Sequence, residues 1–94
     1  PNTGQVLMNL GNAYGPLGDY GKQKELVEKA LAIHIKYYGE EHLQTGMTLA
    51  NLGSAHRGLD SKVQALKCYQ KAYAIFTAHQ HPLAAMVKSW MEEL

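Results

Sequence analysis

The apolar positions of this chain recur at helical spacing in five successive segments. The spacing is clear over residues 6–14, from Tyr20 to a turn at 39–42, and from Leu43 to Gly58. It resumes after residue 61 and ends near His79, and a last amphipathic stretch covers residues 83–94. Sustained period-two alternation is absent, so the pattern predicts five helices and no strands.

Helix-breaking and helix-capping residues separate these segments. Gly15, Pro16 and Gly18 interrupt the first pattern, and Asp19 is suited to cap the second helix. Asp60 or Ser61 can cap the fourth helix in the same way. The short connections predict that each helix lies antiparallel to the next.

The chain repeats itself. Asn9-Leu10-Gly11-Asn12 returns as Asn51-Leu52-Gly53-Ser54, a shift of 42 positions, and the same shift carries residues 29–33 onto 71–75 without a gap. A fixed period of this size is typical of stacked helical repeats. We therefore predict an all-α solenoid with one repeat over about 3–38, a second over about 42–79 and a final capping or truncated helix over about 83–94.

The register of the last helix has two solutions. A shift of 42 aligns Met91 and Leu94 with Leu49 and Leu52, whereas a shift of 39 aligns His81 with His42 and Met86 with Met47. The first keeps apolar residues on apolar positions and is preferred. The end of the chain partway through a third copy suggests a fragment of a longer array, and the alternative is a two-repeat unit that a capping helix closes.

Small residues recur where two helices would cross. Gly11 and Gly53 fall mid-helix, where glycine costs roughly 1 kcal/mol relative to alanine, so a repeated packing reason is expected. Ala30 and Ala72 would face them from the second helix of each pair. The large Tyr14 should fill the space between successive helices, and His56 takes its place in the second copy as a packed, hydrogen-bonded substitute.

This pattern resembles the tetratricopeptide repeat. The signature positions are Leu10, Gly11, Tyr14, Gly18, Val27 and Ala30, then Leu52, Gly53, His56, Ala65, Tyr69 and Ala72. The 42-residue spacing and the Gly39-Glu40-Glu41-His42 turn are similar to the kinesin-light-chain subtype, with Leu43 where that subtype usually has proline. Gln23, Asp60 and Lys62 depart from the family pattern, and Gln23 predicts a splayed first pair or a buried amide hydrogen bond.

The residues that point away from Leu10 and Tyr14 would form one wall of the array. This candidate partner-binding set consists of Gln5, Met8, Asn9, Asn12, Asn51, Ser54 and Arg57. An asparagine amide can donate to and accept from the backbone of a peptide whatever its sequence, and the resemblance implies this role for Asn9 and Asn51. Arg57 would pair with a carboxylate. The alternative is that these residues are only solvated polar positions.

Net charge and the absence of known motifs exclude several classes of function. Nine Lys and Arg against eight Asp and Glu leave a net charge of +1, which gives no general reason to bind nucleic acid or an anionic membrane. No phosphate-binding, dinucleotide-binding, zinc-protease or hydrolase motif occurs, so neither catalysis nor a cofactor is expected. His79 and His81 make a weak metal motif, and the single Cys68 reads as a core residue.

Stacked repeats expose long curved surfaces. We therefore expect a protein–protein interaction module that holds an extended or helical peptide on its concave face. The alternative is a structural spacer, or a segment that self-associates through the ends of the array. Trp90 would cover the open end of the second repeat. The single cysteine favours a cytoplasmic setting.

Overall fold

The computed structural model describes residues 2–94, and five helices account for most of them. Their order and bounds are α1 (Asn2–Tyr14), α2 (Tyr20–Tyr38), α3 (Leu43–Gly58), α4 (Lys62–Ala78) and α5 (Leu83–Glu92). The all-α prediction is confirmed, and no strand occurs among the described residues. The last helix ends two residues before the expected Leu94.

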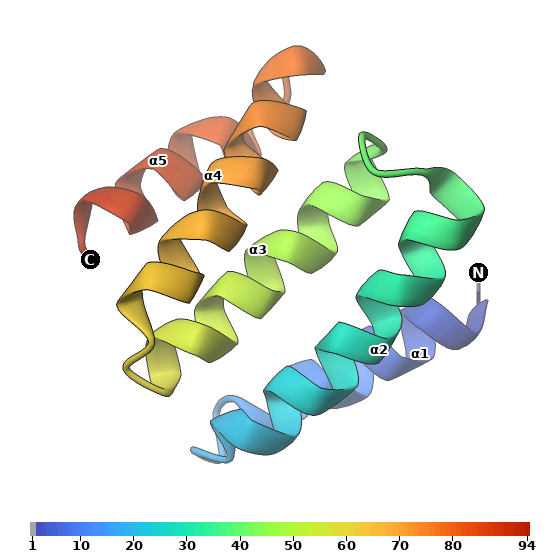
Figure 1. Ribbon diagram of the computed structural model, residues 1–94, viewed down its shortest axis with the longest axis vertical. Coiled ribbons are helices and arrows are strands. Elements are labelled where there is room, and N and C mark those ends of the chain that lie inside the picture. The colour runs from blue at the N-terminus through green and yellow to red at the C-terminus, as the bar shows by residue number, and fades with distance from the viewer. Residues whose placement is uncertain (1) are drawn as a thin grey trace.

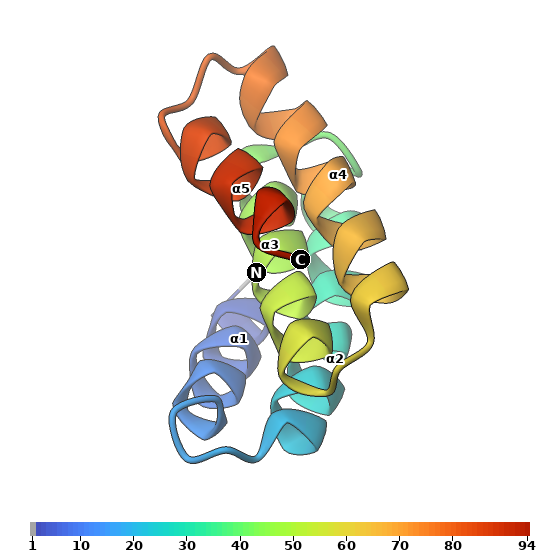
Figure 2. The same ribbon diagram turned by 90° about the vertical axis from the view of Figure 1, so that its left-hand side faces the viewer.

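Each helix packs against the next one along the chain. Figure 1 shows α3 running between the α1–α2 pair and the α4–α5 pair. Figure 2 shows that α1, α3 and α5 lie on one side of the molecule, whereas α2 and α4 lie on the other. The structure therefore has two broad surfaces, which we call the α1–α3–α5 face and the α2–α4 face.

The glycines at the helix crossings have the packing role that the repeat predicts. A Cβ atom on Gly53 would lie 2.7 Å from the Tyr69 ring, and one on Gly11 would lie 2.9 Å from Val27. Ala30 and Ala72 are fully buried. The second pair of helices therefore approaches closely because α3 has no side chain at the point where Tyr69 crosses it.

The core is concentrated in the second half of the chain. Tyr69 and Phe76 of α4 are fully buried, and Val87 of α5 packs into the same cluster. Trp90 lies against Tyr69 with the ring centroids 5.9 Å apart, so it covers the end of the second repeat as expected. Cys68 is buried between the repeats beside Val27 and Leu52, and this burial raises the pKa of its thiol.

The outer face of α1 differs from the sequence expectation. Leu10 belongs to the predicted apolar core, yet it is 48% exposed, whereas its counterpart Leu52 is only 6% exposed. The reason is that α2 covers this face of α3, and no described helix covers the same face of α1. Val6 and Leu17 are exposed on the same helix and the turn that follows it.

The turns also show which capping predictions hold. The Asp19 side chain accepts a hydrogen bond from the Lys22 amide at 3.1 Å, so it caps α2 as expected. Ser61 occupies the N-cap position of α4, but its side chain makes no capping hydrogen bond. Asp60 adopts a φ of +63°, the conformation that Gly18 adopts in the first repeat. The departure from the family glycine therefore places an aspartate in left-handed backbone.

Two histidines begin helices in the same way. Nδ1 of His42 accepts a hydrogen bond from the Gln44 amide at 3.0 Å, and Nδ1 of His81 accepts one from the Leu83 amide at 3.1 Å. The two histidines are related by a shift of 39, because α4 is two residues shorter than α2 and Pro82 stands between His81 and α5, whereas His42 directly precedes α3. The preference for the 42-residue register is thus wrong at the start of α5.

Candidate functional site

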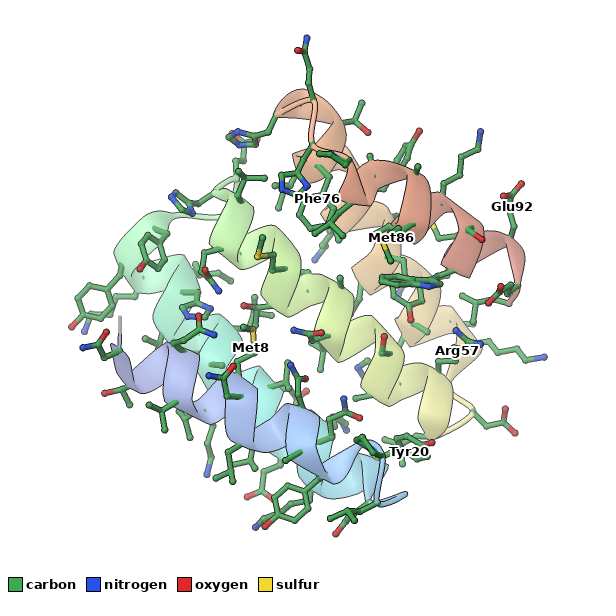
Figure 3. The ribbon with its side chains drawn as sticks, turned by 180° about the vertical axis from the view of Figure 1, so that it is seen from behind. Met8, Tyr20, Arg57, Phe76, Met86 and Glu92 are labelled. Carbon is green, nitrogen blue, oxygen red and sulfur yellow. The ribbon has the colours of Figure 1, made fainter. Side chains whose placement is uncertain are left out.

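The predicted partner-binding residues come together on the α1–α3–α5 face. Asn9 is exposed, and both Asn12 and Asn51 are half-buried, so neither half of the repeated asparagine pair is lost in the core. Figure 3 views this face directly, with α1, α3 and α5 side by side. The successive helices therefore place amide side chains from two repeats along one surface.

A chain of amides joins the first two helices of this face. The Gln44 side chain donates to Gln5 Oε1 at 3.1 Å, and Gln5 donates to Asn9 Oδ1 at 3.0 Å. The carbonyl oxygen of Asn9 is therefore already in use. Its NH₂ group is the part that a peptide carbonyl would contact.

Met8 lies deeper than the sequence suggests. Its side chain is only 7% exposed, and its sulfur lies 3.4 Å from Thr48 Oγ1 on α3. Met8 is therefore buried against α3 through its contact with Thr48, rather than exposed with Asn9. Figure 3 shows Met8 between α1 and α3.

A hollow opens where Met8 meets the second repeat. It has a volume of about 250 Å³, and we call it the first hollow. Its apolar lining comes from four helices, and Asn51 lies at its edge: Met8, Met47, Ala50, Phe76, Leu83, Val87 and Trp90. An apolar floor beside a polar amide is the composition expected of a small ligand-binding site.

Sequence reasoning missed the contribution of α4 and α5 to this hollow. The signal was present in the 39-residue register, which aligns Trp90 with Asn51 and Leu83 with Gln44. Both residues then fall on the same helical face as the predicted wall. Phe76 had no such signal, because it reaches the hollow from the opposite layer.

The other two predicted residues have partners within the chain. The Ser54 hydroxyl lies 3.0 Å from the Tyr69 hydroxyl, so it is tied to the core. Arg57 pairs with Glu93 at 3.4 Å, and both side chains are about half exposed. An exposed ion pair of this kind contributes little, so a ligand carboxylate could replace Glu93.

No metal site is present in the described part of the chain, since no group of three or more His, Cys, Asp or Glu residues gathers there. His79 and His81 serve separate purposes. His79 Nε2 lies 3.0 Å from the Glu41 carbonyl oxygen, while His81 begins α5. Within residues 2–94, no helix is both long and apolar enough to span a bilayer.

Comparison with known families decides the identity of the repeat. The family model for the tetratricopeptide repeat matches residues 2–78, which span both helix pairs. The chain belongs to the tetratricopeptide repeat family. No curated protein sequence matches it. Tetratricopeptide repeats mediate protein–protein interaction and are not enzymatic, so the general role expected from the sequence is supported.

A buried polar network of this tetratricopeptide repeat chain contacts Met8, one of the residues that line the first hollow. His34 is only 1% exposed, and its Nδ1 lies 2.7 Å from Thr48 Oγ1. The Thr48 hydroxyl donates to the Gln44 carbonyl oxygen at 2.9 Å, so it accepts from His34. Nδ1 then carries a proton, and Nε2 has no hydrogen-bond partner among residues 2–94. Protonation would add a buried charge without an acceptor.

This network predicts a pH-dependent stability. Burial lowers the pKa of His34, with His42 adding to the effect, and burial beside Lys24 lowers the pKa of His56 despite the opposing Glu28. As the pH falls, these histidines are therefore protonated at a higher pH in the unfolded chain than in the native one. The free energy of unfolding should be highest above about pH 7 and fall as the pH drops through about 6.5, levelling off once the native histidines titrate.

Urea unfolding followed by circular dichroism between pH 5 and pH 8 measures this slope. The His34→Gln variant keeps a donor toward Thr48 but cannot titrate. Its slope should be smaller than that of the wild type by up to about 1.4 kcal/mol per pH unit, the value for one proton. Identical slopes in the two proteins would contradict the assignment of His34.

Proposed function

We propose that this chain binds an extended segment of a partner protein across the α1–α3–α5 face. The observation that carries the proposal is the position of Asn51, a half-buried amide at the edge of the first hollow. An extended peptide needs donors and acceptors for its backbone and a recess for a side chain. This face supplies the hydrogen-bonding amides and the recess within the length of one repeat.

The two asparagines would act on the peptide backbone. Asn9 presents its NH₂ group, and Asn51 presents an amide one repeat further along. An apolar side chain of the peptide would enter the first hollow between Met47 and Trp90. A carboxylate of the peptide would compete with Glu93 for Arg57. The preformed stack of helices would lose little entropy on binding.

The kinesin-light-chain-like subtype is part of this proposal. It is supported by the 42-residue shift between Asn9 and Asn51 and by the Gly39–His42 turn, in which Gly39 has a φ of +91°. An intracellular setting is proposed with it, on the basis of the single, buried Cys68.

A displayed library of random peptides provides the test. We expect selection on the 94-residue chain to yield peptides with an apolar anchor. Their affinity, measured by calorimetry, should fall about tenfold or more in the Asn9→Ala/Asn51→Ala variant, since each substitution removes a backbone hydrogen bond worth roughly 1 kcal/mol.

The Gln70→Ala variant is the matched control, because it removes an exposed amide from α4. It should bind the selected peptides as the wild type does. Equal affinity of the double asparagine variant and the control would refute the role of the asparagines.

A second function is favoured by the outer face of α1. Leu10 and Val6 are exposed at positions whose counterparts, Leu52 and Thr48, are buried beneath α2. We propose that this surface self-associates, with a second copy of the chain covering it. Analytical ultracentrifugation should then show a mass above that of one chain, which the Val6→Lys/Leu10→Lys variant would lose. A monomer at every wild-type concentration would exclude this function.

A further inference from the structure

The α2–α4 face contains a hollow that the sequence did not predict. It has a volume of about 300 Å³, and we call it the second hollow. Leu31 and Ile35 of α2 form one side, Ala74 and Ile75 of α4 form the other, and Leu49 of α3 lies at its floor. In Figure 1 this region lies between α2 and α4, near the turn that joins α2 to α3.

The second hollow follows from the way the helices stack. Helices α2 and α4 lie in one layer and each packs against α3, which forms the base of the space between them. Gly46 brings α3 close to α4 at this end, since a Cβ atom there would lie 2.9 Å from Ile75. Leu49 at the floor and Ile75 at the side are nearly buried, whereas Ile35 on the other side is exposed.

The mouth of the second hollow is acidic at one end. Glu40 and Glu41 line it from the α2–α3 turn, and both are exposed. Within residues 2–94 neither carboxylate takes part in an ion pair. Lys71 of α4 is the one cation that lines this hollow in the described structure, so the rim carries a net charge of −1.

The acidic turn is held in place. His79 at the end of α4 lies with its Nε2 3.0 Å from the Glu41 carbonyl oxygen. Tyr38 stacks on His42 with the ring centroids 4.5 Å apart, which fixes the other side of the turn. A further depression, lined in part by Glu40, Glu41 and His79, continues beyond it. Both glutamates thus stand between an apolar recess and an open polar one.

We propose that the second hollow is a separate protein-docking site for a basic, apolar segment of a partner protein. One aliphatic side chain of the segment enters the hollow, and a neighbouring Lys or Arg pairs with Glu40 and Glu41. The volume is at the lower end for small-molecule sites, which suits one or two side chains better than a whole ligand. Unpaired carboxylates beside an apolar floor select a cationic neighbour.

This site is independent of the one proposed on the α1–α3–α5 face. The two hollows share no lining residue, and they open on different layers of the array. The chain can then hold two segments at once, which is what a scaffold requires.

The test is a displayed library of random peptides selected on the wild-type chain and counter-selected on the Glu40→Gln/Glu41→Gln variant. The surviving peptides should combine an aliphatic residue with Lys or Arg. They should bind the variant at least tenfold more weakly and compete poorly with peptides that depend on Asn51. The Glu28→Gln/Glu92→Gln variant, which loses the same charge elsewhere, should bind like the wild type.

Three results would overturn the proposal. The first is that no peptide distinguishes the wild type from the variant. The second is that the surviving peptides lack basic residues. The third is a Glu40- and Glu41-dependent dimer of the chain itself in ultracentrifugation, which would make the second hollow an interface between copies. Circular dichroism melting should be unchanged in the variant, because both glutamates are exposed.

Discussion

The Phe76→Ala variant should lose roughly 3–5 kcal/mol of its free energy of unfolding. Phe76 is fully buried in the cluster that joins α3, α4 and α5, and it also lines the first hollow. Its removal deletes a large apolar side chain and leaves a cavity between layers that cannot close without moving α5. A loss of this size is comparable to the whole stability of many small domains.

Urea unfolding monitored by circular dichroism at 222 nm is the measurement. The Val63→Ala variant is the control on the same helix, because Val63 is 67% exposed. It should change the free energy of unfolding by less than about 0.5 kcal/mol. Equal losses in the two variants would contradict the placement of α4.

The Gly53→Val variant should lose roughly 1–3 kcal/mol through overpacking. A Cβ atom at residue 53 would lie 2.7 and 2.8 Å from two atoms of the Tyr69 ring. That ring cannot withdraw, because it is fully buried, contacts Trp90 and lies 3.0 Å from Ser54 through its hydroxyl. The usual gain from replacing a helical glycine is therefore outweighed by displacement of α4.

Gly21 is a glycine whose replacement should stabilise the protein. It lies in α2, where an added Cβ atom would meet nothing closer than Asp19 Oδ1 at 4.0 Å. The Gly21→Ala variant should gain roughly 0.5–1 kcal/mol from the lower backbone entropy of its unfolded state. If Gly53→Val proved as stable as the wild type, the close crossing of α3 and α4 would be wrong.

The helices and their order could be predicted because the relevant signals are local. Helical spacing, the Asp19 cap and the repeated glycines at residues 11 and 53 each depend on neighbours in sequence or on the 42-residue shift. The asparagine surface could be predicted for the same reason. Residues at equivalent positions of two repeats must share a face when the repeats stack.

The features that could not be predicted depend on which neighbouring helix covers a given face of each helix. Leu10 and Leu52 are the same residue at equivalent positions, yet one is exposed and the other buried, because only Leu52 has a preceding helix packed on it. Met8 also owes part of its burial to another helix, because its sulfur contacts Thr48 of α3. Sequence periodicity finds the apolar side of a helix but does not show whether a partner is present.

Polar contacts between residues far apart in the sequence could not be predicted either. His34 meets Thr48 across two helices, and His79 reaches the Glu41 carbonyl over 38 positions. From the sequence alone, a histidine in either place could equally well be a surface residue. The second hollow likewise brings together residues of α2, α3 and α4 that are far apart in the sequence, so the sequence pointed only to the α1–α3–α5 face.

The most direct test of the account is an amide chemical-shift map of the labelled chain bound to a selected peptide. For an Asn51-dependent peptide, we predict the largest changes at residues of the α1–α3–α5 face that border the first hollow, including Asn9, Met47, Asn51 and Trp90. Changes confined to the outer face of α1 or to the α2–α4 face would contradict the claim that this repeat binds its partner across α1, α3 and α5.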